Sequence, residues 1–291
     1  MNVVLFNLYD IPGYLKTCIK QIQHFNPDAT IHLITDKNIQ APGINCYNVN
    51  QFGITFGLAQ KVKFFKDNNV KHHRELFLSS ALRFLYIYEL ARHLKLEDIF
   101  TFDNDVMIYG DLKEIANSLK WKTNIAITQS VKNEFICGFS YFRSHTDLTE
   151  IAGDMESFLQ YSQNELKDIF GNAFTGDFIS EMSLLFYINQ VRNLNAYILP
   201  SLPKDSLNGR LVFDSITYGH VLGGLSPNNG GDGTPFIDKN HITADELLSN
   251  NVRVVFHPDL KKPFVYDSEG KQYDLFNLHL HSKNLDAFKS F

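Results

Sequence analysis

The chain has 291 residues, of which 44% are hydrophobic and 20% charged, a composition typical of a globular protein with a large core. Its 27 basic and 32 acidic residues give a net charge of −5 without a long basic cluster, which disfavours a nucleic-acid-binding protein. Three widely spaced cysteines indicate neither a disulfide framework nor a zinc site. An acid as early as Asp10 argues against a signal peptide, and no apolar stretch is long enough to span a bilayer, so we expect a soluble, cytoplasmic protein.

The first half alternates strand-like and helix-like segments. The apolar run Val3–Leu8 predicts a buried strand, and Asp10 is expected to cap a helix that begins near Pro12. This alternation predicts an α/β fold with a mostly parallel central sheet and flanking helices. The further expected elements are strands at Ile31–Ile34 and Cys46–Val49, a helix from about Glu75 to Leu94, a strand leading to Asp103, a helix capped by Asp111, and strands at Ile125–Ile127 and Phe139–Phe142.

The second half is less regular, and its composition predicts a flexible loop at Ser226–Gly233. No linker or repeat divides the chain, so we expect one domain with an elaborated C-terminal half. The expected elements are helices from Thr146 to Phe158 and from about Asp177 to Val191, and strands near Ala196–Leu199 and Val252–Phe256.

Two carboxylates follow the apolar run that ends at Phe102, in the sequence Asp103-Asn104-Asp105-Val106. Where a chain leaves a buried strand it can turn both acids toward one point. Paired oxygen ligands at the carboxyl edge of an α/β sheet suit Mg²⁺ or Mn²⁺ beside a phosphorylated ligand. The motif therefore predicts a divalent metal and a nucleotide.

Arg83 lies in the middle of a helix that is apolar around nearly its whole circumference. A buried guanidinium requires an anionic partner, because an unpaired one costs several kcal/mol. Its partner is expected to be Asp103, Asp105 or a ligand phosphate; a structural ion pair or a stem that extends its charge to solvent remains the alternative.

A third cluster lies near the C-terminus, in Asn277-Leu278-His279-Leu280-His281-Ser282-Lys283. In extended chain, His279, His281 and Lys283 share one face, while the two leucines face the core. An imidazole can complete a Mn²⁺ shell begun by carboxylates, and an ammonium group can hold a diphosphate. We favour His281 over His279 as the metal ligand because it lies nearer Lys283; a polar strand edge is the alternative.

These motifs, in the order Ile31–Asp36, Arg83, the acidic pair and the C-terminal His/Lys segment, resemble those of GT-A fold nucleotide-sugar glycosyltransferases with a D-x-D motif. The resemblance covers nearly the whole chain. It implies a Rossmann-like nucleotide-binding half over about 1–130 and an acceptor half over about 131–291 within a single domain. The C-terminal segment lacks the His-x-x-Gly-x-x-Lys spacing of glycogenin-like retaining enzymes, so the resemblance leaves both His279 and His281 as candidate ligands.

By this resemblance, Asp105 binds the metal directly, and Asp103 contacts either the ribose or the metal through water. Lys283 holds the diphosphate of a nucleotide sugar, most simply a UDP-sugar, with Mn²⁺ or Mg²⁺ as cofactor. The resemblance also implies donor contacts from residues near the first strand and near the donor sugar, namely Asn7, Tyr9, Asp36 and Gly138.

Asp177 and Glu181 are four residues apart, which in the expected helix puts both on one face of its first turn. Inverting transfer needs a carboxylate that takes the proton of the attacking acceptor hydroxyl. Either acid is a candidate base, although helix capping explains each of them equally simply.

The sequence thus predicts metal-dependent transfer of a sugar to a hydroxyl of an oligosaccharide or glycoconjugate, with inversion favoured. One alternative is a nucleotidyltransferase, although Asp10-Ile11-Pro12-Gly13 offers neither the glycines nor the basic residues of its usual phosphate loop. The other alternative is a non-catalytic module that binds nucleotide sugars or glycans.

Overall fold

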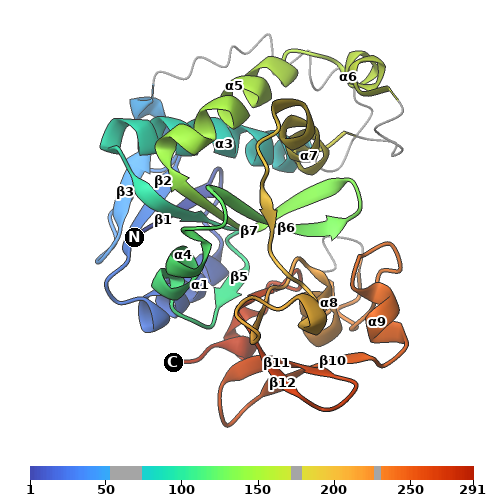
Figure 1. Ribbon diagram of the computed structural model, residues 1–291. Coiled ribbons are helices and arrows are strands. Elements are labelled where there is room, and N and C mark those ends of the chain that lie inside the picture. Colours follow the sequence, from blue (N-terminus) through green and yellow to red (C-terminus); the bar gives the residue numbers. More distant parts are fainter. Residues whose placement is uncertain (53–73, 172–178, 226–230) are drawn as a thin grey trace.

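The computed structural model describes residues 1–52, 74–171, 179–225 and 231–291 (Figure 1). A seven-stranded sheet with the order β3-β2-β1-β4-β7-β6-β8 forms its centre. β7 is antiparallel to both of its neighbours and the remaining pairings are parallel, so the sheet is mixed but mostly parallel. The strands are β1 (Asn2–Asn7), β2 (Thr30–Thr35), β3 (Asn45–Asn48), β4 (Glu97–Thr101), β6 (Ile125–Val131), β7 (Glu134–Ser144) and β8 (Tyr197–Ile198).

Helices cover both faces of this sheet (Figure 1). The upper face in that view carries α3 (Arg74–Leu94), α5 (Thr149–Phe158) and α7 (Glu181–Arg192), and the lower face carries α1 (Gly13–Phe25) and α4 (Leu112–Leu119). Each face has its own apolar core, because the central strands are buried on both sides. The shorter described helices are α6 (Gln163–Phe170), α8 (Thr217–Gly223) and α9 (Ala244–Leu248), with 3₁₀ turns at Val49–Gln51, His145–Leu148, Pro203–Asp205 and Leu285–Phe288.

The C-terminal segment returns to the centre of the molecule. β13 (Asn277–His279) pairs antiparallel with β5 (Val106–Ile108), which places His279 opposite Val106. The amide of Leu280 then donates to the carbonyl of Asp105 at 2.9 Å. This pairing brings the C-terminal His/Lys segment beside the acidic pair.

A second sheet, in the order β10-β11-β12-β9, consists of β9 (Leu211–Val212), β10 (Val252–His257), β11 (Lys262–Asp267) and β12 (Gln272–Leu275).

The expected fold class, a mostly parallel α/β sheet with flanking helices and an elaborated C-terminal half, is confirmed. Asp111 caps α4 as expected, since its carboxylate accepts from the amide of Lys113 at 2.8 Å. The expected cap by Asp10 is wrong, because α1 begins at Gly13 after an extended Pro12 and has no side-chain cap.

The second half differs more from the expectation. The helix expected to open at Thr146 is preceded by a 3₁₀ turn and begins at Thr149, while α6, β11 and β12 were not expected. Asp177 and the first part of the Ser226–Gly233 loop lie outside the described residues. The described helix α7 begins at Glu181 with Ser180 as its N-cap, so the expected shared first turn of Asp177 and Glu181 is wrong.

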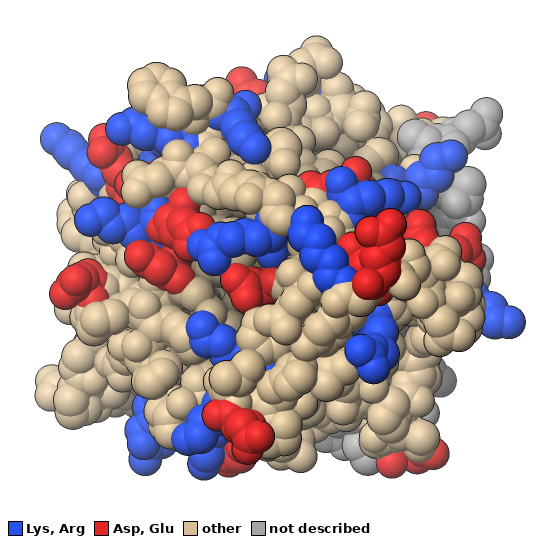
Figure 2. Space-filling view, turned by 60° about the horizontal axis from the view of Figure 1, so that its bottom comes forward, with Lys and Arg blue, Asp and Glu red and all other residues tan. Residues whose placement is uncertain are grey.

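Positive and negative side chains alternate over the face shown in Figure 2, with no large field of one sign. In the described part of the chain, no helix is both long and apolar enough to cross a membrane.

Candidate active site

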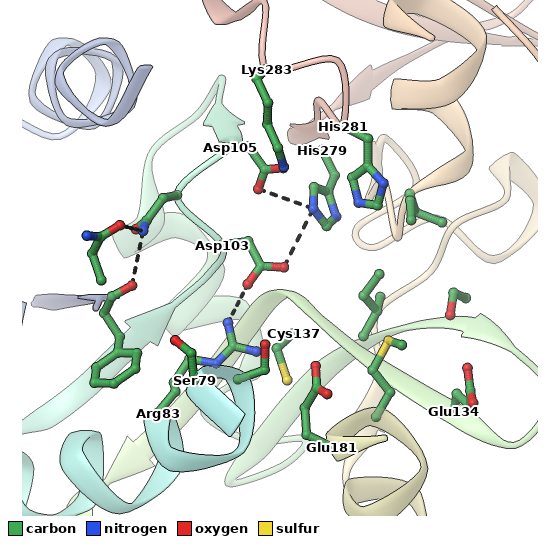
Figure 3. Close-up of a pocket in the computed structure, with 18 of the residues that line it drawn as sticks. Ser79, Arg83, Asp103, Asp105, Glu134, Cys137, Glu181, His279, His281 and Lys283 are labelled. Atoms are coloured by element: carbon green, nitrogen blue, oxygen red, sulfur yellow. Dashed lines mark hydrogen bonds and ion pairs between the residues drawn. The ribbon is translucent and has the colours of Figure 1, made fainter. Parts of the chain in front are cut away.

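The acidic pair lies in the turn between β4 and β5. The amide of Asn104 donates to the carbonyl of Phe6 at 3.0 Å and to the Oδ1 of Asn7 at 3.1 Å, which directs this side chain toward the end of β1. Asp103 and Asp105 thereby face a common region on the other side of the turn (Figure 3). Asp105 is 4% exposed, whereas the side chain of Asp103 is 30% exposed.

His279 contacts both carboxylates. Its Nε2 lies 3.3 Å from Oδ1 of Asp105 and 3.5 Å from Oδ2 of Asp103 (Figure 3). Its Nδ1 lies 3.2 Å from the carbonyl oxygen of Ser215. Since a carbonyl only accepts, Nδ1 carries a hydrogen, and in the neutral ring the lone pair of Nε2 faces the acids. This is the orientation in which an imidazole binds a metal together with carboxylates.

His281 and Lys283 join the same group. The side chains of Asp105, His279 and His281 offer ligand atoms that all lie within 4.8 Å of one another, a group able to hold a metal ion. The ammonium of Lys283 forms an ion pair with Oδ2 of Asp105. The three C-terminal side chains converge as expected, but a continuous strand does not bring them together. β13 ends at His279, and Lys283 has a positive φ of 63° in the turn that follows.

The negative charge of Asp105 is compensated within this group by His279 and Lys283. Burial raises the pKa of Asp105, but His279 and Lys283 outweigh this effect and hold it well below its usual range. Burial lowers the pKa of His279, but Asp105 above all reverses this and raises it to about 9. Burial also lowers the pKa of Lys283, and the carboxylate of Asp105 again raises it overall. A divalent cation would replace the positive charge that the imidazolium now supplies, so the donor set fits a metal.

Arg83 projects from α3 into this group and is 6% exposed. Its guanidinium forms an ion pair with Oδ1 of Asp103, which confirms the expected partner among the acidic pair. Burial lowers the pKa of the guanidinium, but Asp103 raises it above its ordinary value. Asp103 is therefore shared between Arg83 and His279, and its two oxygens point to different cations.

Glu181, the first residue of α7, is 9% exposed and lines the same cavity. Figure 3 shows its carboxyl group pointing toward Cys137 and Arg83. Burial raises the pKa of Glu181 to about 7, against the opposing effect of Arg83. Its Oε2 has no hydrogen-bond partner among the described residues. Glu181 thus combines a carboxyl group poised near neutral pH with an unused oxygen, as a general base requires.

The residues expected near the nucleoside lie at or just after the ends of β1 and β2. Asn7 and Tyr9 line the cavity, and the exposed Tyr9 has a positive φ of 69°. Asp36 accepts from the backbone amide of Tyr9 at 3.1 Å. Asp36 therefore acts on the cavity through the backbone of Tyr9, since it does not itself line the cavity.

Gly138 has a structural explanation that differs from the one expected. A Cβ at this position would lie 2.7 Å from Nδ1 of His279 and 3.2 Å from the carbonyl oxygen of Ser215. The glycine therefore makes room for the imidazole and for its hydrogen bond to Ser215.

These residues surround a cavity of about 720 Å³. Several of its lining residues were not predicted from the sequence. Ser79 and Ser80 lie one turn before Arg83 on α3, and a polar pair in an apolar helix could have indicated them. The other unpredicted polar lining residues have no local sequence pattern. They are Tyr14 in the first turn of α1, and Ser130, Glu134, Asp238, Asn240 and His241, which lie in loops or near strand ends.

No family model and no curated protein sequence matches the chain. Among solved structures, the galactosyltransferase LgtC in complex with donor and acceptor sugar analogs matches 69% of this chain and 74% of its own, at 13% identity and a TM-score of 0.42. Mouse xyloside xylosyltransferase 1 matches 69% and 86%, at 6% identity and a TM-score of 0.45.

The glycosyltransferase GlyE of Streptococcus pneumoniae TIGR4 matches 68% of this chain, at 14% identity and a TM-score of 0.39, and the match spans 44% of GlyE. All three are glycosyltransferases, the class that the sequence motifs resemble. Similarity at this level assigns no role to any residue of this chain, so the chemistry is argued below from the site itself.

Proposed function

We propose that the protein is a metal-dependent glycosyltransferase that moves a sugar from a nucleotide sugar, most simply a UDP-sugar, to a hydroxyl of a glycan. The observation that carries this proposal is the convergence of Asp105, His279 and Lys283 at the carboxyl end of β4, inside one large cavity. Ligands of open α/β sheets bind at this edge.

Asp105 and His279 would hold the cation, with Asp103 and His281 within reach of it. A mixed set of carboxylate and imidazole ligands suits Mn²⁺ and also accepts Mg²⁺. When bound, the cation offsets the negative charge that develops on the departing diphosphate.

Lys283 would hold the diphosphate. Its ammonium now neutralises Asp105, and a cation on Asp105 would release it for a phosphate oxygen. Arg83 remains on Asp103 and keeps that carboxylate in place. Asn7 and Tyr9 would border the nucleoside, and Asp36 would fix the unusual backbone of Tyr9.

Glu181 would take the proton of the attacking acceptor hydroxyl, because it is a buried carboxylate with a raised pKa in the same cavity. Direct attack with such a base gives inversion at the sugar carbon. Asp177 stays a second candidate from the sequence. We further propose that the chain acts as one catalytic domain, with the nucleotide bound mainly by about 1–130 and the acceptor by about 131–291, whose C-terminal segment also holds the metal and the diphosphate.

Nucleotide release from a panel of nucleotide sugars, with and without EDTA, tests this function. We expect slow release of UDP from at least one UDP-sugar with Mn²⁺, loss of release in EDTA, and a reduction of about a hundredfold or more in Asp105→Asn. The control is Asp259→Asn, an exposed carboxylate in the turn after β10. Pyrophosphate release from a nucleoside triphosphate would instead indicate a nucleotidyltransferase, and binding of nucleotide sugars without any release would indicate a non-catalytic module.

A further inference from the structure

Asp214 is a fully buried carboxylate that lies outside the cavity. It is 0% exposed and is not a lining residue, so it touches neither donor nor acceptor. Burying a carboxylate is costly unless other groups compensate it. Asp214 accepts three hydrogen bonds, all from backbone amides. Its Oδ1 accepts from Tyr218 at 3.0 Å, and its Oδ2 accepts from Gly219 and from His279, each at 2.9 Å.

We propose that Asp214 is a positioning residue for the metal: through the backbone of His279, it holds this imidazole where it binds the cation together with Asp105. The same contacts select His279 over His281 as the ligand. This inference rests on the proposed glycosyltransferase function and deepens it, because it assigns a role to a residue that touches neither the substrates nor the metal.

The backbone of His279 is held from two sides. Successive amides of a strand point to opposite sides. The amide of Leu280 points toward β5 and donates to the carbonyl oxygen of Asp105, so the amide of His279 points away from β5. Asp214 lies on that other side and accepts this hydrogen bond. Without its carboxylate, a buried amide next to the metal site would lose its partner, which is unfavourable.

The residue that follows Asp214 holds the ring of His279. The carbonyl oxygen of Ser215 lies 3.2 Å from Nδ1 of His279. One dipeptide therefore fixes both the main chain and the imidazole of this ligand. Groups that fix the tautomer and the orientation of a ligand imidazole matter for metal binding, and their loss typically weakens it by about ten- to a hundredfold.

Asp214 is itself fixed against β13. The side chain of Asn277 accepts from the amide of Asp214 at 3.1 Å and donates to its carbonyl oxygen at 2.8 Å. The helix α8 also packs directly on His279, because a Cβ at Gly219 would overlap the carbonyl oxygen of His279 and lie 2.7 Å from its carbonyl carbon. The hydrogen bonds and this close approach leave the backbone of His279 little room to shift.

His281 lacks a comparable support. Its ring contacts the rings of His220 and His279, with centroid separations of 4.9 and 4.5 Å, but it has no hydrogen bond to a described residue. His279 is therefore the imidazole whose position is fixed before the cation arrives. A preorganised ligand binds more tightly because less ordering is required on binding.

The simplest alternative is that Asp214 only caps α8. Ile216, the N-cap residue of this helix, provides no side-chain cap, and Asp214 accepts from two amides of the first turn instead. Both roles predict a loss of stability when Asp214 is changed. They differ in metal binding, because a pure cap acts on the fold and not through His279.

The Mn²⁺ affinity of the full chain without nucleotide, measured by EPR titration, tests the positioning role. Asp214→Asn keeps the volume but removes the charge and one acceptor oxygen, which weakens the bonds to the three amides. We expect Mn²⁺ to bind about tenfold more weakly. The control is Asp111→Asn, which removes the carboxylate that caps α4 outside the cavity and should change the affinity by less than about twofold. Unchanged affinity in Asp214→Asn would overturn the inference.

Double variants show whether Asp214 acts through His279. In His279→Ala, adding Asp214→Asn should weaken Mn²⁺ binding by no more than about twofold further, because the ring that Asp214 positions is absent. In His281→Ala, the same addition should keep its effect of about tenfold. Equal losses in both backgrounds would contradict the inference and identify Asp214 as a helix cap.

A second variant acts on the same contact from α8 and carries the test if Asp214→Asn does not fold. Gly219→Ala places a methyl group against the backbone of His279 and should also weaken Mn²⁺ binding by about tenfold. Its control is Gly153→Ala on α5, where a Cβ meets no atom within 4 Å, and this variant should bind Mn²⁺ as the wild type does. Wild-type affinity in Gly219→Ala would contradict the inference.

Donor hydrolysis separates the two proposals. Release of UDP by the wild type, together with unchanged Mn²⁺ affinity in Asp214→Asn, refutes only the positioning role. A wild type that binds no Mn²⁺ and hydrolyses no donor refutes the proposed function and this inference with it.

Discussion

Replacing Arg83 by methionine tests whether the acidic pair depends on a buried guanidinium. Methionine keeps an apolar stem on α3 and removes the charge. Arg83 is buried against Asp103, with Glu181 also close enough to act on its pKa. The variant therefore leaves the carboxylate of Asp103 beside other acids without its strongest cationic partner.

The expected cost follows from the burial of the two partners. Removing one member of a buried ion pair destabilises a protein by about 3–5 kcal/mol. The side chain of Asp103 is 30% exposed, so water screens part of the stranded charge. We therefore expect Arg83→Met to lower the free energy of unfolding by about 2–3 kcal/mol. Mn²⁺ should stabilise this variant more than it stabilises the wild type, because the cation replaces part of the missing charge.

Urea unfolding in EDTA and in Mn²⁺ measures both effects. The matched control is Arg92→Met on the same helix, because Arg92 pairs with Glu89 at 2.7 Å on the surface and should contribute less than about 1 kcal/mol. If Arg83→Met unfolds at the same urea concentration as Arg92→Met, the guanidinium is solvated and the reasoning about the buried pair is wrong.

Four further predictions concern the reaction and the metal. Glu181→Gln should lower kcat by about a hundredfold or more and remove the rise in rate as pH increases through about 7, since only the deprotonated carboxylate accepts a proton; an unchanged pH profile would exclude Glu181 as the base. His279→Ala should weaken Mn²⁺-dependent UDP binding by about ten- to a hundredfold (~1.4–2.8 kcal/mol) and more than His281→Ala does. In the wild type, calorimetry in several buffers should show that Mn²⁺ releases close to one proton at pH 7, with metal affinity rising toward pH 9. Gly138→Ala should weaken Mn²⁺ binding with most of the fold retained, because its Cβ would displace the His279 ring; wild-type metal affinity in this variant would show that the ring tolerates the methyl group.

The first half of the fold and the centre of the site could be predicted because their patterns are local. A continuous apolar run predicts a buried strand, an isolated arginine in an apolar helix predicts an anionic partner, and two acids after a buried strand predict a metal site. Each of these patterns is contained within a short stretch of the sequence. The C-terminal His/Lys segment was also recognisable, from its alternation of leucine with polar residues. Its pairing with β5, about 170 residues earlier in the chain, required the structure.

The details that were not predicted depend on tertiary contacts. The preference for His281 assumed an extended chain through Lys283, whereas the turn after His279 changes which imidazole contacts both carboxylates. The preference between the two imidazoles stays open to the binding experiment above. Glu134 at the start of β7 and Asp238 in a loop are single acids without a local pattern, and only the packing of distant segments places both in the wall of one cavity.

The most direct test of the central claim is the affinity of UDP with and without Mn²⁺, measured by calorimetry in the wild type and in Asp105→Ala. Asp105 is the carboxylate that both His279 and Lys283 contact, so it should be required for the metal to link the protein to a diphosphate. The account predicts that Mn²⁺ tightens UDP binding at least tenfold in the wild type and has no effect in Asp105→Ala. An equal gain from Mn²⁺ in both proteins would contradict it.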